Sequence, residues 1–142
     1  TLAGDDAVLY LWATGPHLPG AIEVVAAWGF TYRSFHVWKK QRVACGFWVR
    51  SNAELLLIAE RGRPCAPSPS ALSRTVVEGD AWADQHSAKP DFAHAQIETQ
   101  WPGARKVELF ARAERDGWEA LGSDLGVNIS TNGFIKTPEM AI

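Results

Sequence analysis

Apolar runs with strand character recur along the chain and alternate with helix signals. The first, AVLYLWAT at 7–14, is continuous and rich in aromatic and branched side chains, which is typical of a strand covered on both faces. Aromatic and β-branched residues at 30–38 and the apolar run at 53–62 predict two further strands. This alternation predicts an α/β domain with a largely parallel sheet, which would place ligands at the carboxyl ends of the strands.

Two segments between these runs carry helix signals. Pro19 opens the first and Gly29 ends it, and the second extends from Pro90 to Gln100, where Pro102-Gly103 stops it. Shorter elements complete the prediction, with strands at 74–79 and 105–112 and loops at 39–51 and 63–73. We assign 1–125 to one domain and expect 126–142 to be a polar, weakly ordered tail.

Composition narrows the classes of protein that fit. The net charge of −2 does not suit a protein that coats nucleic acid by bulk charge, so any such contact must come from a local patch. No apolar run is long enough to cross a bilayer, so we expect no membrane association. Cys45 and Cys65 form no C-x-x-C pair, which favours reduced thiols in a cytoplasmic protein.

Several site types lack their motifs. No G-x-G-x-x-G, G-x-x-x-x-G-K-[ST] or G-x-S-x-G segment occurs, and the four histidines show no H-E-x-x-H spacing. The sequence therefore gives no support for a dinucleotide-binding fingerprint, a P-loop, the nucleophile elbow of an α/β-hydrolase or a metal site. We interpret each histidine as a surface or half-buried residue.

A lysine and a glutamate stand at positions that suit a ligand site. Lys89 precedes the helix that begins at Pro90, where free backbone N–H groups already favour an anion. Glu108 lies near the carboxyl end of an otherwise apolar strand, where a carboxylate needs a partner. One interpretation is a structural ion pair of Glu108 with Arg112 or Lys89. The other is a small ligand whose carboxylate meets Lys89 and whose hydroxyls meet Glu108.

The segment 31–54 combines basic and aromatic residues. From Arg33 to Arg50 it carries five basic residues and no acid, interleaved with flat rings. Basic charge beside flat rings suits a nucleic-acid channel, in which phosphates are paired and bases stack. The alternative is a solvated loop with its tryptophans in the core. We favour the core for Trp38, and for Trp48 both interpretations stay open.

Four separated blocks of the sequence resemble the MT-A70 family of adenine-N6 methyltransferases. They are LYLWATGPHLPGAIEVVAAWGFTYRSFHVWKK, GFWVRSNAELLLIAERGRP, HSAKPD and WPGARKVELFARAERDGWEALGSDL, which together reach Leu125. The resemblance implies a Rossmann-like, S-adenosylmethionine-dependent methyltransferase fold that acts on adenine in DNA or RNA.

The resemblance also implies roles for individual residues. Lys89 matches the position that meets the methionine carboxylate of S-adenosylmethionine, and Glu108 matches one at the ribose. Further residues that match the donor site are Leu109, Phe110, Arg112, Arg115, Ser123 and Asp124. Glu54 matches an acceptor-side glutamate, and Trp48 and Arg50 lie in the adjoining substrate loop. Lys39, Lys40 and Arg42 are candidate nucleic-acid contacts from the basic charge of the segment 31–54 alone.

One family motif is absent. The catalytic Asp-Pro-Pro-Trp, which lies upstream of the LYLW strand in the family, occurs nowhere in these 142 residues. The chain also opens without a methionine, so we expect a fragment that lacks N-terminal elements of the fold and does not methylate alone. A DNA enzyme is favoured over an RNA enzyme because no appended RNA-binding segment is visible.

Alternatives follow from the missing motif. The chain could be a non-catalytic subunit, derived from such an enzyme, that binds nucleic acid or a partner. A sheet without its N-terminal elements would expose an unpaired edge, so a homodimer or heterodimer is a further expectation.

Overall fold

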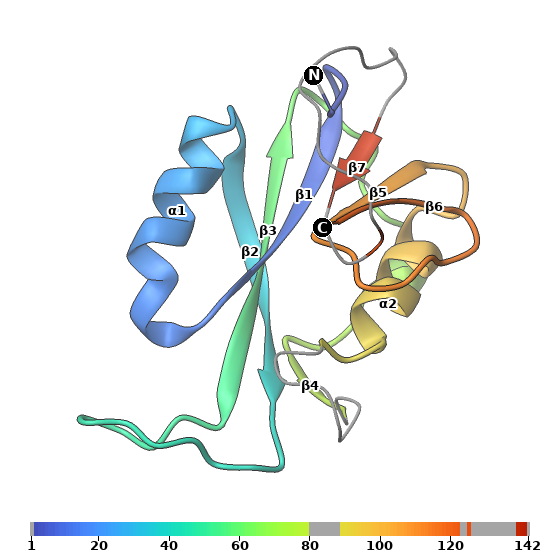
Figure 1. Cartoon of the computed structure of the whole chain (residues 1–142). Coiled ribbons are helices and arrows are strands. Elements are labelled where there is room, and N and C mark those ends of the chain that lie inside the picture. Colours follow the sequence, from blue (N-terminus) through green and yellow to red (C-terminus); the bar gives the residue numbers. More distant parts are fainter. Residues whose placement is uncertain (1, 80–88, 123–124, 126–138, 142) are drawn as a thin grey trace.

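A computed structural model describes residues 2–79, 89–122, 125 and 139–141 of the chain. Within these residues one mixed sheet has the strand order β4-β2-β3-β1-β7-β5-β6. The helix α1 lies on one face of the sheet and α2 on the other (Figure 1). The elements are β1 (Ala7–Ala13), α1 (Leu18–Ala27), β2 (Thr31–Lys39), β3 (Ala53–Arg61), β4 (Val76–Glu78), α2 (Phe92–Gln100), β5 (Arg105–Leu109), β6 (Trp118–Leu121) and β7 (Glu139–Ala141), with 3-10 turns at Gly15–His17 and Pro69–Ala71.

The strand directions confirm the expectation of a largely parallel sheet, with β3 as the exception among the described strands. β3 pairs antiparallel with both β1 and β2, and these are the longest ladders in the sheet. The reason is the link between β2 and β3, which is a hairpin without a crossover helix, and such a link joins antiparallel strands. The pairs β2–β4, β1–β7, β5–β7 and β5–β6 are parallel.

Alternation along β1 sorts the core into two clusters. Leu9 packs with Val25 of α1 on one face, whereas Tyr10 packs with Ile97 of α2 on the other. Side chains of successive residues in a strand point to opposite faces, so a strand covered on both sides reads as a continuous apolar run. The prediction of a doubly covered strand is therefore confirmed for β1.

Element boundaries agree closely with the sequence except at β5. The strand was expected to continue to residue 112, but it ends at Leu109 because Phe110 has a positive φ of 62°. α2 begins at Phe92, two residues after the proline that was expected to open it.

Two short strands, β6 and β7, were not predicted. β7 falls within the expected tail, and the other residues of that tail lie outside the described part of the chain. No helix in the described part has the length and apolar character needed to cross a membrane.

Candidate functional site

The carboxyl ends of β1, β2 and β5 lie at the same edge of the sheet. β1 and β2 both oppose β3, and β5 runs parallel to β1 through β7. The amino end of β3 meets this edge, because Leu55 pairs with Ala13 and Glu54 pairs with Trp38. This edge, hereafter the carboxyl edge, therefore gathers residues from strands that are distant in sequence.

Glu54 stands between two lysines at the carboxyl edge. Nζ of Lys40 donates to its Oε1, and Nζ of Lys89 donates to its Oε2 at 2.6 Å. The side chain of Glu54 is only 9% exposed, while those of the lysines are 28% and 31% exposed. Burial alone would raise the pKa of Glu54, but the hydrogen bonds and charges of Lys40 and Lys89 outweigh it and hold that pKa below its usual range. The three groups carry one net positive charge.

Aromatic rings form a floor beneath these lysines. Nζ of Lys40 lies 5.0 Å from the ring centroid of Trp38, and Nζ of Lys89 lies 5.5 Å from that of Trp12. Trp12 makes edge-to-face contacts with Trp38 and with Phe92, at centroid distances of 5.9 and 6.0 Å. Cation–π contacts and the T-shaped ring pairs fix the lysines in place. The network is thus preorganised before any ligand arrives.

The first turn of α2 connects this network to Glu108 on β5. Lys89, which precedes α2, and Phe92, the first residue of α2, both contact Trp12. His94 lies two residues after Phe92 and contacts β5. Nε2 of His94 lies 3.1 Å from Oε2 of Glu108, and its ring lies edge-to-face on Trp118 with 5.0 Å between centroids. Because a carboxylate only accepts, Nε2 carries the proton of this hydrogen bond. Lys89 and Glu108 therefore both border the first turn of α2.

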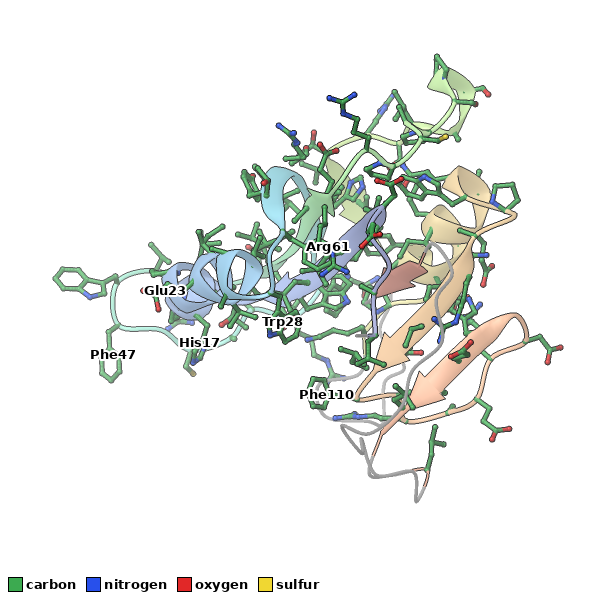
Figure 2. The ribbon with its side chains drawn as sticks, turned by 90° about the horizontal axis from the view of Figure 1, so that it is seen from above. His17, Glu23, Trp28, Phe47, Arg61 and Phe110 are labelled. Atoms are coloured by element: carbon green, nitrogen blue, oxygen red, sulfur yellow. The ribbon has the colours of Figure 1, made fainter. Side chains whose placement is uncertain are left out.

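The chain turns sharply immediately after β5. Phe110 has a left-handed backbone, and its ring is 76% exposed. Figure 2 shows Phe110 projecting beside the end of β5, on the side away from α2. Leu109 is half-buried and Arg112 is exposed. Arg115 reaches back to α2, where it pairs with Glu98 at 3.3 Å and with Asp91.

The hairpin between β2 and β3 carries an exposed apolar tip. Phe47 and Trp48 are fully or almost fully exposed, and Val49 is 75% exposed. Phe47 lies at the far end of the hairpin, away from the sheet (Figure 2). Arg42 and Arg50 stand at the two ends of this segment, and neither makes an ion pair within the part of the chain that the structure describes. We call residues 42–50 the hairpin tip.

The structure separates the predicted substrate residues into two groups. Lys40, Glu54 and the donor-side Lys89 form one network, whereas Trp48 and the two arginines belong to the hairpin tip. Lys39 faces outward and pairs with Glu78 at 2.7 Å. Ser123 and Asp124 lie outside the described residues.

The alternatives left open by the sequence are partly resolved. Trp38 is 4% exposed, as favoured, and the core interpretation of Trp48 is wrong. Lys89 donates to Glu54 and Glu108 contacts His94, so the structural pair of Lys89 with Glu108 is not the contact that the described residues make.

His94 is the site residue that the sequence analysis did not single out. A signal was available, because Ala93 and Ile97 are spaced as the buried face of a helix and His94 stands beside them. Trp12 was assigned to a covered strand. Its contact with Lys89 arises because the segment that leads into α2 packs against β1, and no local sequence pattern predicts that packing.

The chain is similar in sequence to proteins of one known family. The MT-A70 family model matches residues 1–124. The chain is 31% identical over 139 residues to the type II methyltransferase M.MunI of Mycoplasma sp, which covers 95% of this chain and 59% of that protein. It is 30% identical over 131 residues to the N(6)-adenosine-methyltransferase catalytic subunit METTL3 of Homo sapiens, which covers 85% of this chain and 22% of METTL3. The chain therefore spans less than two thirds of the length of these relatives.

Proposed function

The chain belongs to the MT-A70 family, and we propose that it comes from an S-adenosylmethionine-dependent N6-adenine methyltransferase. It would form most of the binding site for the methyl donor and part of the binding site for the acceptor adenine. The observation that carries the proposal is the Lys40–Glu54–Lys89 network at the carboxyl edge, with Glu108 beside the same helix turn. Ligands of open α/β sheets bind outside the carboxyl ends of the strands, which is where these groups lie.

The residues present fit the three parts of the methyl donor. Lys89 uses one of its three N–H donors on Glu54, so further donors can meet a carboxylate. Glu108, whose side chain is 22% exposed, accepts from His94 through one oxygen and can accept from ribose hydroxyls. The exposed ring of Phe110 offers a flat face for the adenine. When bound, S-adenosylmethionine supplies the methyl group.

The acceptor side is built to position a poor nucleophile. The exocyclic nitrogen of adenine has its lone pair delocalised into the ring, so orientation and hydrogen-bond acceptors for its N–H groups are needed. Glu54, held ionised by two lysines, is a fixed acceptor at this edge. Trp48, Arg42 and Arg50 of the hairpin tip would then meet the nucleic acid outside the pocket.

We further propose that the acceptor is DNA and that these 142 residues alone do not transfer methyl groups. The family's Asp-Pro-Pro-Trp motif, which contributes a carboxylate and a backbone carbonyl at the reacting nitrogen, is absent from the sequence. The likeness to the type II methyltransferase M.MunI extends over 95% of this chain, against 85% for METTL3, and this supports DNA over RNA.

Donor binding tests the proposal most directly. Calorimetric titration of the chain with S-adenosylmethionine should show saturable binding, and Glu108→Ala should weaken it at least tenfold, since a hydrogen bond to a charged group contributes about 1.5–3 kcal/mol. Glu78→Ala, which removes a carboxylate remote from β5, is the matched control. Equal affinities of the wild type and Glu108→Ala would refute the assignment of the donor site.

The same titration separates the enzyme from a non-catalytic binding subunit. The missing motif favours this second function, in which the hairpin tip binds nucleic acid without any methyl donor. Nucleic-acid binding with no detectable donor binding would establish it. Binding of matched DNA and RNA oligonucleotides that contain adenine then tests the choice of acceptor, with tighter RNA binding as the contrary result.

A further inference from the structure

A histidine of α2 contacts the carboxylate that the proposed function assigns to the ribose of the methyl donor. Nε2 of His94 lies 3.1 Å from Oε2 of Glu108 on β5, and the two side chains are 16% and 22% exposed. This contact engages one of the two carboxylate oxygens, and the lone pairs that remain can accept from hydroxyl groups. The orientation of Glu108 toward a ligand therefore depends on where the ring of His94 is held.

The ring of His94 is held in place by a chain of side-chain contacts. It lies edge-to-face on Trp118 of β6, with 5.0 Å between centroids. Nε1 of Trp118 donates to Oε1 of Glu98 at 2.8 Å, and Glu98 stands one turn after His94 on the same helix. Arg115 also pairs with Glu98, at 3.3 Å. The position of the histidine ring is therefore fixed by α2 and β6 together before any ligand binds.

The second ring nitrogen of His94 shows which nitrogen carries the proton. Nδ1 is buried and has no hydrogen-bond partner among the described residues. Oδ1 of Asp91 lies 3.9 Å from it, beyond hydrogen-bond distance, and the Asp91 carboxylate pairs with Arg115. A neutral ring with its proton on Nδ1 would bury an unpaired donor and would leave Nε2 with nothing to donate to Glu108. The tautomer that fits these contacts carries the proton on Nε2.

We propose that His94 is a positioning residue for donor binding, because its Nε2–H orients the Glu108 carboxylate toward the ribose hydroxyls. This inference rests on the proposed function, which assigns Glu108 to the ribose. A flexible side chain that is ordered only on binding costs affinity, and a hydrogen bond that orders it beforehand removes that cost from the binding step. His94 acts through Glu108 and needs no contact with the donor itself.

S-adenosylhomocysteine and its 2′,3′-dideoxy analogue test this proposal as a matched pair, because they differ only in the ribose hydroxyls. The hydroxyl preference is the dissociation constant of the analogue divided by that of S-adenosylhomocysteine, measured by calorimetric titration of the full chain. It should be at least about tenfold in the wild type and absent in Glu108→Ala. His94→Leu should lower it at least about threefold, because the hydrogen bond that orients Glu108 is lost. An unchanged preference in folded His94→Leu would overturn the proposal.

A double variant shows whether His94 acts through Glu108. His94→Leu should weaken the binding of S-adenosylhomocysteine in the wild-type chain and should have no further effect in the Glu108→Ala chain, since the group that it orients is gone. Equal losses of affinity in the two backgrounds would contradict the proposed route. Such losses would instead indicate that His94 only supports the fold around the site.

A conservative replacement and a control on the same helix sharpen this comparison. His94→Gln provides an amide N–H in place of Nε2–H and should keep most of the hydroxyl preference. Gln96→Leu removes a different hydrogen bond of α2, the one to the carbonyl of Ala71 at 2.8 Å, and should leave the preference unchanged. Loss of the preference in folded His94→Gln, or in Gln96→Leu, would contradict the proposal.

The outcomes distinguish this inference from the proposed function. Weaker donor binding in Glu108→Ala together with an unchanged preference in His94→Leu would overturn the role of His94 alone, whereas no binding of S-adenosylhomocysteine by the wild type would overturn both. If His94→Leu does not fold, long-range proton–nitrogen correlation NMR of the wild type decides the matter. With S-adenosylhomocysteine bound, the ring proton should be on Nε2 of His94, and a proton on Nδ1 alone would refute the proposal.

Discussion

Two tryptophans with similar sequence surroundings, Trp38 and Trp48, differ completely in solvent exposure. Trp38 is 4% exposed, donates from Nε1 to the carbonyl of Gly79 at 2.8 Å and lies under the ammonium group of Lys40. Trp48 is 98% exposed at the hairpin tip, between two arginines without ion pairs among the described residues. Both belong to the basic and aromatic segment 31–54.

The difference lies in how the charges near each tryptophan are used. Next to Trp38, Lys40 is paired with Glu54 and the rings are packed, so the carboxyl edge is a rigid site whose groups stabilise one another. At the hairpin tip, rings and arginines contact solvent, so they contribute little to folding and are available to a partner. Substitutions should therefore affect stability at the first region and binding at the second.

The largest effect is expected when Glu54 is replaced. Glu54→Gln leaves two ammonium groups, each about 30% exposed, around a neutral amide. Removing one partner of a largely buried ion network destabilises proteins by about 3 kcal/mol, so urea unfolding at pH 7 should show a loss of this order. The contrast is Glu78→Gln, which breaks the exposed pair with the adjacent Lys39 and should leave the midpoint unchanged. Equal losses in both variants would contradict the distinction between the regions.

The stability of the carboxyl edge should depend on pH. The folded-state pKa of Glu54 is lowered, so the unfolded chain takes up a proton first as the pH falls. The stability from the Glu54 carboxylate is therefore complete above the ordinary value of about 4.3 and is lost as the pH falls through the lowered one. The difference in unfolding free energy between wild type and Glu54→Gln should narrow below about pH 4.3. A difference that stays constant down to pH 3 would mean that the carboxylate charge is not responsible.

At the hairpin tip, Trp48→Ala should weaken binding without weakening the fold. Stacking of a base on an exposed ring contributes about 1–3 kcal/mol, so affinity for single-stranded DNA should fall roughly five- to 150-fold, while the urea midpoint stays constant. Trp28→Ala, at a half-exposed tryptophan at the end of α1, is the matched control and should leave DNA affinity unchanged. Full affinity in Trp48→Ala would remove the tip from the nucleic-acid surface.

The smallest effect concerns which basic residues contact phosphates. Arg42→Gln should reduce the slope of log affinity against log salt by about 0.7–0.9, because one phosphate contact is lost. Lys39→Gln should change the slope less, since its ammonium group is already paired with Glu78. Equal changes in slope at both positions would show that the ion pair opens freely on binding.

Much of the fold could be read from local patterns. β1, β2, β3 and both helices lie within two residues of their predicted boundaries, because covered strands and capped helices have distinct periods and termini. β6 and β7 were missed because each is short and contains no run of apolar or β-branched residues like the one that marks the equally short β4. The direction of β3 was missed because an apolar run predicts a covered strand but does not predict whether that strand is parallel or antiparallel to the strands beside it.

Part of the candidate site could be predicted as well. Lys89, Glu108 and Glu54 were identified from a helix entrance, a carboxylate in an apolar strand and the family blocks. Their partners were not, because Lys89 meets Glu54 across 35 positions and Glu108 meets His94 across 14. Such contacts arise from the docking of α2 on the sheet.

The amino-acid sequence by itself determined the class of domain, the strand at 7–14 that is covered on both faces, and the residue types available at the carboxyl edge. Local periodicity and composition encode these features. Only the tertiary structure decided that Glu54 binds two lysines and that Trp48 is exposed while Trp38 is buried. Those outcomes depend on which surfaces meet after the chain collapses, and the burial of each side chain is set by neighbours that lie far away in sequence.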